Sequence, residues 1–414
     1  MSDNLPFELQ SEIIKRLPVI PLIRFRSVSK AWKSLIDSSD FTADYTGKVQ
    51  HLLVNYYHYP RNDHKYVLIV DDHTFPQHKV SPTPPELVNM LKCCRLIGSS
   101  HGLLCLYGYY RDSHFPETEM SVLWNIQIRK AVAVVLPNPR GHLGFGVCSY
   151  TNDPKIVNIR PYSRWRDSES ISCIPWQVEI FNLSTGAWRS LYNNLPRKSV
   201  ELFRSQVVID GLLYWLATDK IAIDGGLRSC NLIVSFDITS EEFGEVNLPD
   251  TLAHDRSRSN LYISKLRKSL VVIESDGVEK TPTFIVWMMG DGNSKSLTKL
   301  FSIYTPDVSI LGVLEFRESG EPILEISEHD LVYSVYDSSL VVYEPYSKHI
   351  TNLGIDGKNL VLSASSYMET LLLHDQPNFV IYDKGKRSIL KQRAVKSRRL
   401  SKHTSKKLNL CNSR

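Results

Sequence analysis

Apolar positions follow a helical spacing over residues 5–41 and alternate as in strands beyond that region. Pro6 suits the first turn of a helix, and Pro18 ends the run that it opens. Between them, four apolar residues fall at helical spacing: Leu9, Ile13, Ile14 and Leu17. Pro21 opens a second short run, and Ser29 suits the N-cap of a third. The pattern predicts three short helices.

This helical region carries more apolar residues than so short a unit can bury. Of residues 5–41, 17 are Leu, Ile, Val, Phe, Trp or Ala. A unit of roughly 40 residues is marginal by itself, and each large apolar side chain left in water forgoes about 1.5–3 kcal/mol. Part of this surface must therefore be shared, either with the rest of the chain or with a partner protein.

Beyond Lys48 the alternation of apolar and polar residues, with turn residues between the runs, predicts strands. One phrase recurs there: a β-rich run that ends in an aromatic residue and is followed by a turn. The aromatic residues stand at steps of 57, 55, 51 and 56 residues, at Trp124, Phe181, Phe236, Trp287 and Tyr343. A second phrase, a polar residue before Gly-Leu-Leu, begins at His101 and Asp210, which are 109 residues apart. The two phrases agree on one repeat of about 55 residues.

A repeat of this length with several short strands in each unit is typical of β-propeller blades. Residues 51–390 hold about six such repeats, and drift between repeats leaves a seventh or an eighth blade open. The run Val380–Gly385 follows Tyr343 too early for another repeat and is expected to help close the ring. A pair of irregular β-sandwiches is the alternative. The predicted fold class is therefore α+β multidomain, a short three-helix unit followed by an all-β propeller-like domain.

The formal net charge of +5 comes from one end of the chain. Eight Lys and Arg residues and no acid fall between Lys391 and Lys407, so the rest of the chain is near −3. Nucleic acid is therefore not an expected partner of the folded body. The basic segment, residues 391–414, is either a nuclear import or acidic-surface signal or a solvated, disordered end.

Cysteine usage and the lengths of the apolar runs indicate the cellular compartment in which the protein is expected. The seven cysteines form no CxxC motif and no metal-ligand spacing, so we expect reduced thiols. Met1–Asn4 is polar and is not followed by a basic and then apolar stretch, so we expect no signal peptide. The longest clean apolar run, Ala131–Leu136, is far shorter than a membrane span. We expect a cytoplasmic or nuclear protein, or one present in both compartments, with no membrane partner.

Candidate catalytic patterns are weak. Gly98–Gly102 satisfies G-x-S-x-G, but a nucleophile elbow needs a helix after it and a strand-like run follows here. Six histidines between residues 51 and 101 lie among several aspartates without a compact ligand pattern. We therefore expect no catalytic residue, no metal and no cofactor, although an acidic pair could still assemble across blades.

Residues 5–32 resemble an F-box almost position for position. The family pattern runs Leu-Pro, an acidic-flanked Ile-Leu, a second Leu-Pro, Leu-x-Arg-Phe and then Val-x-Lys-x-Trp. The matching stretches are Leu5-Pro6-Phe7-Glu8-Leu9, Glu12-Ile13-Ile14-Lys15-Arg16-Leu17-Pro18-Val19 and Leu22-Ile23-Arg24-Phe25-Arg26-Ser27-Val28-Ser29-Lys30-Ala31-Trp32. Ser29 departs from the pattern, since plant relatives often carry Cys there.

The resemblance implies that ten residues build or face the contact with a Skp-type adaptor protein. They are Leu5, Pro6, Leu9, Ile13, Ile14, Leu17, Pro18, Leu22, Val28 and Trp32. Some of the ten are expected to form the core of the three-helix unit instead, and the sequence alone does not divide the two roles.

The strand-rich part resembles the plant F-box-associated, kelch-like region. Residues 98–106 match its frequent marker, Gly-x-x-x-Gly-Leu-Leu-Cys-Leu. The paired glycines of true kelch repeats are absent except at Gly225-Gly226, so a propeller-like repeat is favoured over a kelch repeat. The resemblance thus implies an F-box at residues 1–45, a substrate-binding propeller-like domain at 50–390 and a basic disordered tail at 391–414.

Such a protein is expected to be the non-catalytic substrate-recognition subunit of an SCF-type E3 ubiquitin ligase. The F-box would bind the Skp-type adaptor, and through it a cullin–RING ligase, while the propeller holds an unknown target protein. The alternatives are an F-box scaffold outside a cullin ligase and a propeller enzyme. Candidate target-binding residues are the loop tips rich in Tyr, Trp and Arg: His58–Arg61, Tyr109–Arg111, Tyr162–Arg166 and Trp176.

Overall fold

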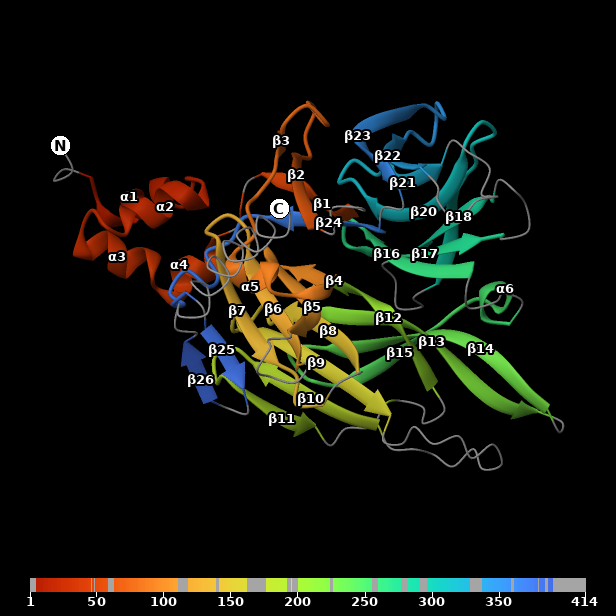
Figure 1. Cartoon of the computed structure of the whole chain (residues 1–414), viewed down its shortest axis with the longest axis horizontal. Coiled ribbons are helices and arrows are strands. Elements are labelled where there is room, and N and C mark those ends of the chain that lie inside the picture. The colour runs from red at the N-terminus through yellow and green to blue at the C-terminus, as the bar shows by residue number, and fades with distance from the viewer. Residues whose placement is uncertain are drawn as a thin grey trace, which may run out of the picture.

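The computed structural model contains a small helical unit beside a ring of β-sheets (Figure 1). It describes residues 5–389 except 46, 48, 59–62, 111–117, 139–140, 162–175, 192–194, 196–199, 224–225, 255–259, 277–281, 291–295, 328–336, 359–360, 379 and 384–385. The basic segment 391–414 therefore lies outside the described residues. None of the described helices is long and apolar enough to cross a membrane.

The three predicted helices are present, and one more follows near the N-terminus. The second begins at Val19 and not at Pro21, because Pro18 is its N-cap and Pro21 lies within its first turn. The bounds of the helices are α1 (Phe7–Ile14), α2 (Val19–Phe25), α3 (Lys30–Ile36), α4 (Ser39–Asp44), α5 (Glu86–Asn89) and α6 (Asp250–Ala253). Pro6 and Pro18 precede α1 and α2, and the Ser29 hydroxyl caps α3 by accepting a hydrogen bond from the Trp32 N–H at 3.1 Å. The additional helix α4 is capped in the same way, by the Ser38 hydroxyl.

The strands form six sheets, which are the six blades of a propeller. From the innermost strand outward, the first blade is β24 (Val361–Met368), β1 (Gln50–His58), β2 (Asp63–Val70) and β3 (Lys79–Val80). The second is β4 (Lys92–Ser100), β5 (Leu103–Tyr110), β6 (Thr118–Asn125), β7 (Lys130–Val135), β25 (Val380–Asp383) and β26 (Lys386–Ile389). The third is β8 (His142–Val147), β9 (Pro154–Pro161), β10 (Trp176–Asn182) and β11 (Ala187–Leu191).

The other three blades each use four consecutive strands. The fourth is β12 (Val200–Ile209), β13 (Leu212–Ile223), β14 (Gly226–Asp237) and β15 (Phe243–Asn247). The fifth is β16 (Leu261–Leu266), β17 (Ser269–Ser275), β18 (Phe284–Met289) and β19 (Leu297–Ile303). The sixth is β20 (Ser309–Phe316), β21 (Pro322–Ser327), β22 (Asp337–Tyr343) and β23 (Ile350–Lys358). The prediction of a propeller of about six blades is confirmed.

The predicted repeat marks equivalent places in successive blades. The five aromatic residues of the first phrase all lie in the third strand of a blade, on β6, β10, β14, β18 and β22. The second phrase forms the tight turn between the first and second strands, where His101 and Asp210 both have a positive φ of 46°. Four of the five aromatic side chains are buried, whereas Trp287 is partly buried and donates its ring N–H to Glu274.

Two C-terminal segments return to the first two blades: β24 closes the ring, and β25 adds an outer strand. Strand β24 pairs antiparallel with β1, with Leu53 opposite Ser365, so the first blade combines both ends of the folded chain. Strand β25 then pairs parallel with β7 on the outer edge of the second blade. The run at Val380, expected to help close the ring, is therefore an added edge of the second blade rather than part of a seventh.

An ion pair joins the sixth blade to the first blade. The Nε of Arg317, just after β20, donates to Asp71, just after β2, at 2.8 Å. The same carboxylate accepts the N–H of Glu318 at 3.0 Å. The guanidinium of Arg317 also lies 4.0 Å from the ring centroid of Phe75. Because both charged side chains are largely buried, this contact fixes the sixth blade against the first.

Candidate functional site

The helical unit presents several apolar side chains to solvent. The exposed fractions are 41% for Leu5, 49% for Phe7, 51% for Leu9, 52% for Ile13, 44% for Ile20 and 63% for Val28. On α1, Leu9 and Ile13 are four residues apart and therefore share one face, whereas the next residue, Ile14, is only 3% exposed. We call these six residues the apolar F-box surface.

The structure divides the ten residues that the F-box resemblance singled out. Six are exposed: Leu5, Pro6, Leu9, Ile13, Pro18 and Val28. Leu17 and Trp32 are half-buried, with Trp32 packed edge-on against Phe25 at 5.0 Å between ring centroids. Ile14 and Leu22 are buried in the core of the helical unit. Phe7 and Ile20 were not among the ten because neither holds a position quoted in the family pattern, yet both are exposed.

The helical unit shares its core with the propeller. Its buried residues pack with Leu371, which follows β24, and with the partly buried Ile128 of the β6–β7 turn. The N–H of Val19 donates to the Glu369 carboxylate at 3.1 Å, and Asp37 contacts the Nε2 of His374 at 3.1 Å. Sharing with the rest of the chain, one of the two possibilities left open by the sequence, thus accounts for part of the apolar excess.

Asp37 is the polar centre of this junction. It accepts a hydrogen bond from the Nη2 of Arg26 at 2.9 Å and forms an ion pair with Lys33 at 3.3 Å. Partial burial acts to raise the pKa of Asp37, but Arg26, Lys33 and His374 together bring it down to about 2. The carboxylate therefore stays ionised and links α2 and α3 to the propeller segment at His374.

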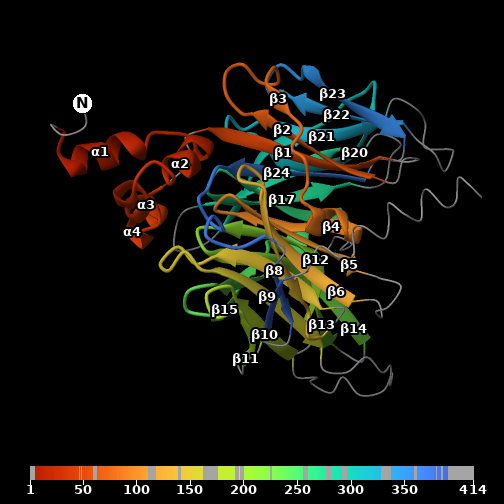
Figure 2. The same cartoon turned by 60° about the vertical axis from the view of Figure 1, so that its left-hand side comes forward.

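The two faces of the propeller are distinct. The near face carries the turns 126–129 and 369–374 that meet the helices, together with the turns between first and second strands. Because successive strands run antiparallel, the second strands end and the third strands begin at the opposite, far face, away from helices α1–α4 (Figure 2). Among the predicted loop tips, Tyr109, Tyr110 and Trp176 lie at this far face and are half-buried. Residues 59–61, 111 and 162–166 lie outside the described residues.

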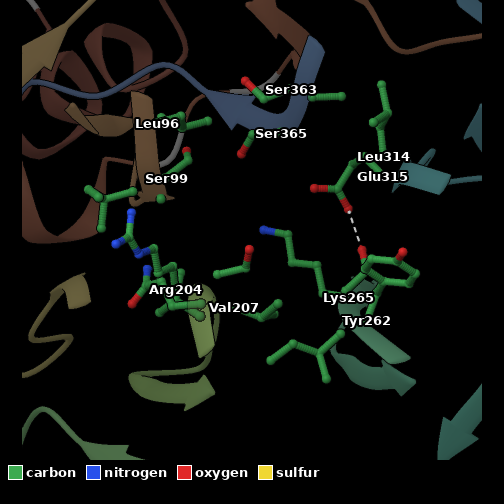
Figure 3. A pocket seen from close by; sticks show the side chains of 18 of the residues that line it. Leu96, Ser99, Arg204, Val207, Tyr262, Lys265, Leu314, Glu315, Ser363 and Ser365 are labelled. Atoms are coloured by element: carbon green, nitrogen blue, oxygen red, sulfur yellow. Dashed lines mark hydrogen bonds between the residues drawn. The ribbon is translucent and has the colours of Figure 1, made fainter. Parts of the chain in front are cut away.

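The centre of the ring holds a cavity of about 730 Å³. Five innermost strands line it, namely β4, β12, β16, β20 and β24. A second hollow of about 370 Å³ continues toward the near face and shares Ser99, Lys265 and Glu315 with the first. Figure 3 shows Lys265 reaching into the open centre from one wall, with Arg204 on the wall opposite.

Glu315 is a buried carboxyl in the wall of this channel, with 7% of its surface exposed. Burial raises its pKa to about 6, although the charge of Lys265 and the N–H of Phe316 act in the opposite direction. The Phe316 N–H donates to it at 3.2 Å and the Ser264 hydroxyl at 3.4 Å (Figure 3). The channel therefore holds a titratable group beside a cation.

The G-x-S-x-G sequence forms the end of β4 and the turn into β5. The Ser100 hydroxyl accepts the N–H of Val147 at 3.0 Å and lies 3.1 Å from the Nδ1 of His101. Since a strand follows the turn, the geometry is that of a blade hairpin and not of a nucleophile elbow. Across the part of the chain that is described, no three His, Cys, Asp or Glu side chains gather as a metal site.

Comparison with known protein families identifies both parts of this architecture. A model of the F-box associated beta propeller domain matches residues 102–366, well over half of the chain. The chain belongs to this family. A model of the F-box domain matches residues 2–44 of the same chain. The resemblance found in the sequence is therefore confirmed for both parts of this F-box protein.

Curated relatives of the F-box protein come from Arabidopsis thaliana. "F-box protein CPR1" is 25% identical over 409 residues, covering 89% of each chain. "Putative F-box protein At5g52610" is 25% identical over 379 residues, covering 88% of this chain and 99% of the relative. "F-box/kelch-repeat protein At3g44120" is 26% identical and covers 76% of this chain and 80% of its own. The similarity thus spans the helical unit and the propeller together.

Proposed function

We propose that this F-box protein is the substrate-recognition subunit of an SCF-type E3 ubiquitin ligase. In this proposal, residues 1–45 bind a Skp-type adaptor, residues 50–390 bind a target protein and residues 391–414 form a separate basic tail. The observation that carries the proposal is the apolar F-box surface: on α1, Leu9 and Ile13 are 51% and 52% exposed on a helix that already has a buried face. Large apolar side chains gathered in water are typical of an interface.

The adaptor contact is proposed for the exposed members of the predicted set. Leu5, Leu9, Ile13 and Val28 would contact the adaptor directly, joined by Phe7 and Ile20. Ile14 and Leu22 would support that surface from the core below, since both are almost fully buried. Because these side chains are already about half-buried, covering each of them at the interface would contribute about 1 kcal/mol.

The target is proposed to bind on the far face of the propeller. The near face is partly occupied by the F-box, whereas the second strands end and the third strands begin at the far face, away from the helices. Aromatic side chains at that face, such as Tyr109, Tyr110 and Trp176, are of the type favoured at binding hot spots. A target held there projects away from the helices that would engage the adaptor.

The proposed role involves no bond chemistry by this chain. A RING subunit and a charged E2 enzyme would supply catalysis, and the F-box protein would raise the effective concentration of target lysines beside the E2 thioester. We propose a cytoplasmic or nuclear location, where such ligases meet their targets.

The test replaces Leu9 and Ile13 together with Asp in the full-length protein. Placing two carboxylates in an apolar interface should weaken adaptor capture by about a hundredfold or more, while the thermal unfolding midpoint stays close to wild type because both positions are exposed. Val80→Asp is the matched control, since Val80 is 61% exposed on β3 of the propeller. Adaptor capture by the double variant at the wild-type level would refute the proposal. Capture of the adaptor without any cullin would refute its ligase part.

A further inference from the structure

The channel contains two arginines whose charge no described carboxylate neutralises. Arg95 on β4 and Arg204 on β12 both line the 730 Å³ cavity. Among the described residues, no ion pair or hydrogen bond joins either guanidinium to an acid. Burial lowers the pKa of Arg95, and the nearby charge of Arg204 lowers it further. The two cations therefore lie close enough to repel each other.

The other charges facing the channel do not offset this pair. Lys265 and Glu315 lie on neighbouring strands and act on each other, so their charges compensate. His142, at the start of β8, has its pKa lowered by burial, and the charges of Arg204 and Arg95 act in the same direction. Glu201 acts on His142 in the opposite direction. Glu315 is the one acid among the described residues that line the 730 Å³ cavity, so once its charge is set against that of Lys265, Arg95 and Arg204 leave about two positive charges there at neutral pH.

Both arginine side chains line the cavity with N–H groups that can bind an anion. The guanidinium of Arg95 lies 4.7 Å from the ring centroid of Tyr107, and stacking on a ring leaves the N–H groups at the guanidinium edge available. Arg204 is exposed to the cavity. Ser205 and Ser363 add hydroxyl groups to the same lining. The planar edge of a guanidinium matches the oxygens of a phosphate, and hydroxyl groups elsewhere in the lining can donate to further oxygens of the same ligand.

We propose that the propeller channel is a binding site for a phosphate monoester, with Arg95 and Arg204 as its principal ligands. A phosphate monoester carries about −1.5 to −2 charges at pH 7, which matches the two arginines. The cavity of about 730 Å³ lies in the size range of small-ligand pockets. The phosphate belongs either to a free small molecule or to a phosphorylated side chain that a partner inserts from the far face. This inference goes beyond the proposed ligase role and does not require it.

The test measures binding of inorganic phosphate and pyrophosphate to the full-length protein. Calorimetric titration at low salt, with chloride at equal ionic strength as reference, should give saturable binding. Arg95→Gln and Arg204→Gln should each weaken it about tenfold, because a charge-assisted, bidentate contact is lost. Arg204→Lys should weaken it less, since the charge remains. Arg228→Gln, the same change at an exposed position of β14, should bind as wild type does.

Two arms then identify the source of the phosphate. Displacement of inorganic phosphate by a nucleoside monophosphate assigns a free small molecule, and displacement by a phosphoserine peptide assigns a partner side chain. Either result supports the site. Absence of saturable binding by the wild-type protein would overturn it, as would equal binding by wild type and both Gln variants with unchanged melting curves. Adaptor capture is scored on the same samples, so failure of the F-box proposal is seen separately.

Discussion

At the scale of single residues, Glu315 shows how the channel combines burial with ionisation. Its carboxyl is 7% exposed, and burial raises its pKa to about 6 from an ordinary value of 4.5. The fold therefore favours the protonated form. The resulting stabilisation is fully present below about pH 4.5 and is lost as the pH rises through about 6.

Glu315→Gln should remove this pH dependence. Relative to wild type, the variant should gain about 2 kcal/mol of unfolding free energy between pH 4.5 and pH 7, because the buried charge no longer forms. Chemical unfolding at a series of pH values measures the difference. Glu318→Gln, the same change at an exposed turn residue, separates burial from simple charge removal. A constant difference between Glu315→Gln and wild type across this pH range would contradict the assignment.

At the scale of elements, the two faces of α1 have different partners. The sequence predicted the helix from its apolar spacing but could not separate Ile13 from Ile14, because both belong to the same apolar run. The packing of the helices on one another separates the two roles: Ile14 lies in a core with Val19 and Leu22, and this core is completed by Leu371, more than 350 positions later. The apolar spacing along α1 alone does not carry that information.

Ile14→Ala should lower the free energy of unfolding by about 3 kcal/mol through the cavity that it leaves. Ile13→Ala, at a side chain that is 52% exposed, should change stability little and weaken adaptor capture instead. Denaturant unfolding and adaptor pull-down on the two variants separate these effects. Equal destabilisation by both substitutions would show that the two faces are not distinct.

The hairpin turns offer a second pair of matched positions. The repeat in the sequence predicted that Gly102 and Gly211 are equivalent, and both have a positive φ, of 73° and 82°. Their surroundings differ. A Cβ at Gly102 would fall on the carbonyl oxygen of Met368 and on Thr370, whereas a Cβ at Gly211 meets nothing within 4 Å.

Gly211→Ala should therefore cost about 1–2 kcal/mol from backbone strain alone. Gly102→Ala should cost about 2 kcal/mol more, because the chain segment after β24 must move. Thermal unfolding of the two variants gives the comparison. If both lose the same stability, the contact with Met368 is not rigid.

At the scale of the whole molecule, the repeat predicted the blade number but not how the ring closes. A periodic pattern reports what each blade has in common, and the closure uses features that occur once. Strand β24 completes the first blade, β25 extends the second, and Asp71 meets Arg317 across 246 positions of sequence. The channel cations Arg95 and Arg204 also come from separate blades, so their convergence had no signal along the chain.

Asp71→Ala should lower the free energy of unfolding by about 2 kcal/mol, because the largely buried Arg317 loses its hydrogen bond to Asp71 and keeps its ion pair with Glu321 at 3.2 Å. Asp307→Ala, at an exposed position just before β20, is the matched control and should be close to neutral. Both effects are measured by denaturant unfolding. A neutral Asp71→Ala variant would show that the closure does not depend on this ion pair.

The shared core of the helical unit has a consequence for synthesis on the ribosome. Ile14, Val19 and Leu22 are translated early, but Leu371 and Glu369, which complete their surroundings, are translated only after strands β1–β24. We expect nascent chains and premature-stop products shorter than about 370 residues to expose an unfinished F-box, accessible to chaperones and proteases. Under the proposed function, we expect full competence for adaptor binding to be acquired only as the last segment docks, so that a protein bound to the proposed adaptor carries a completed propeller.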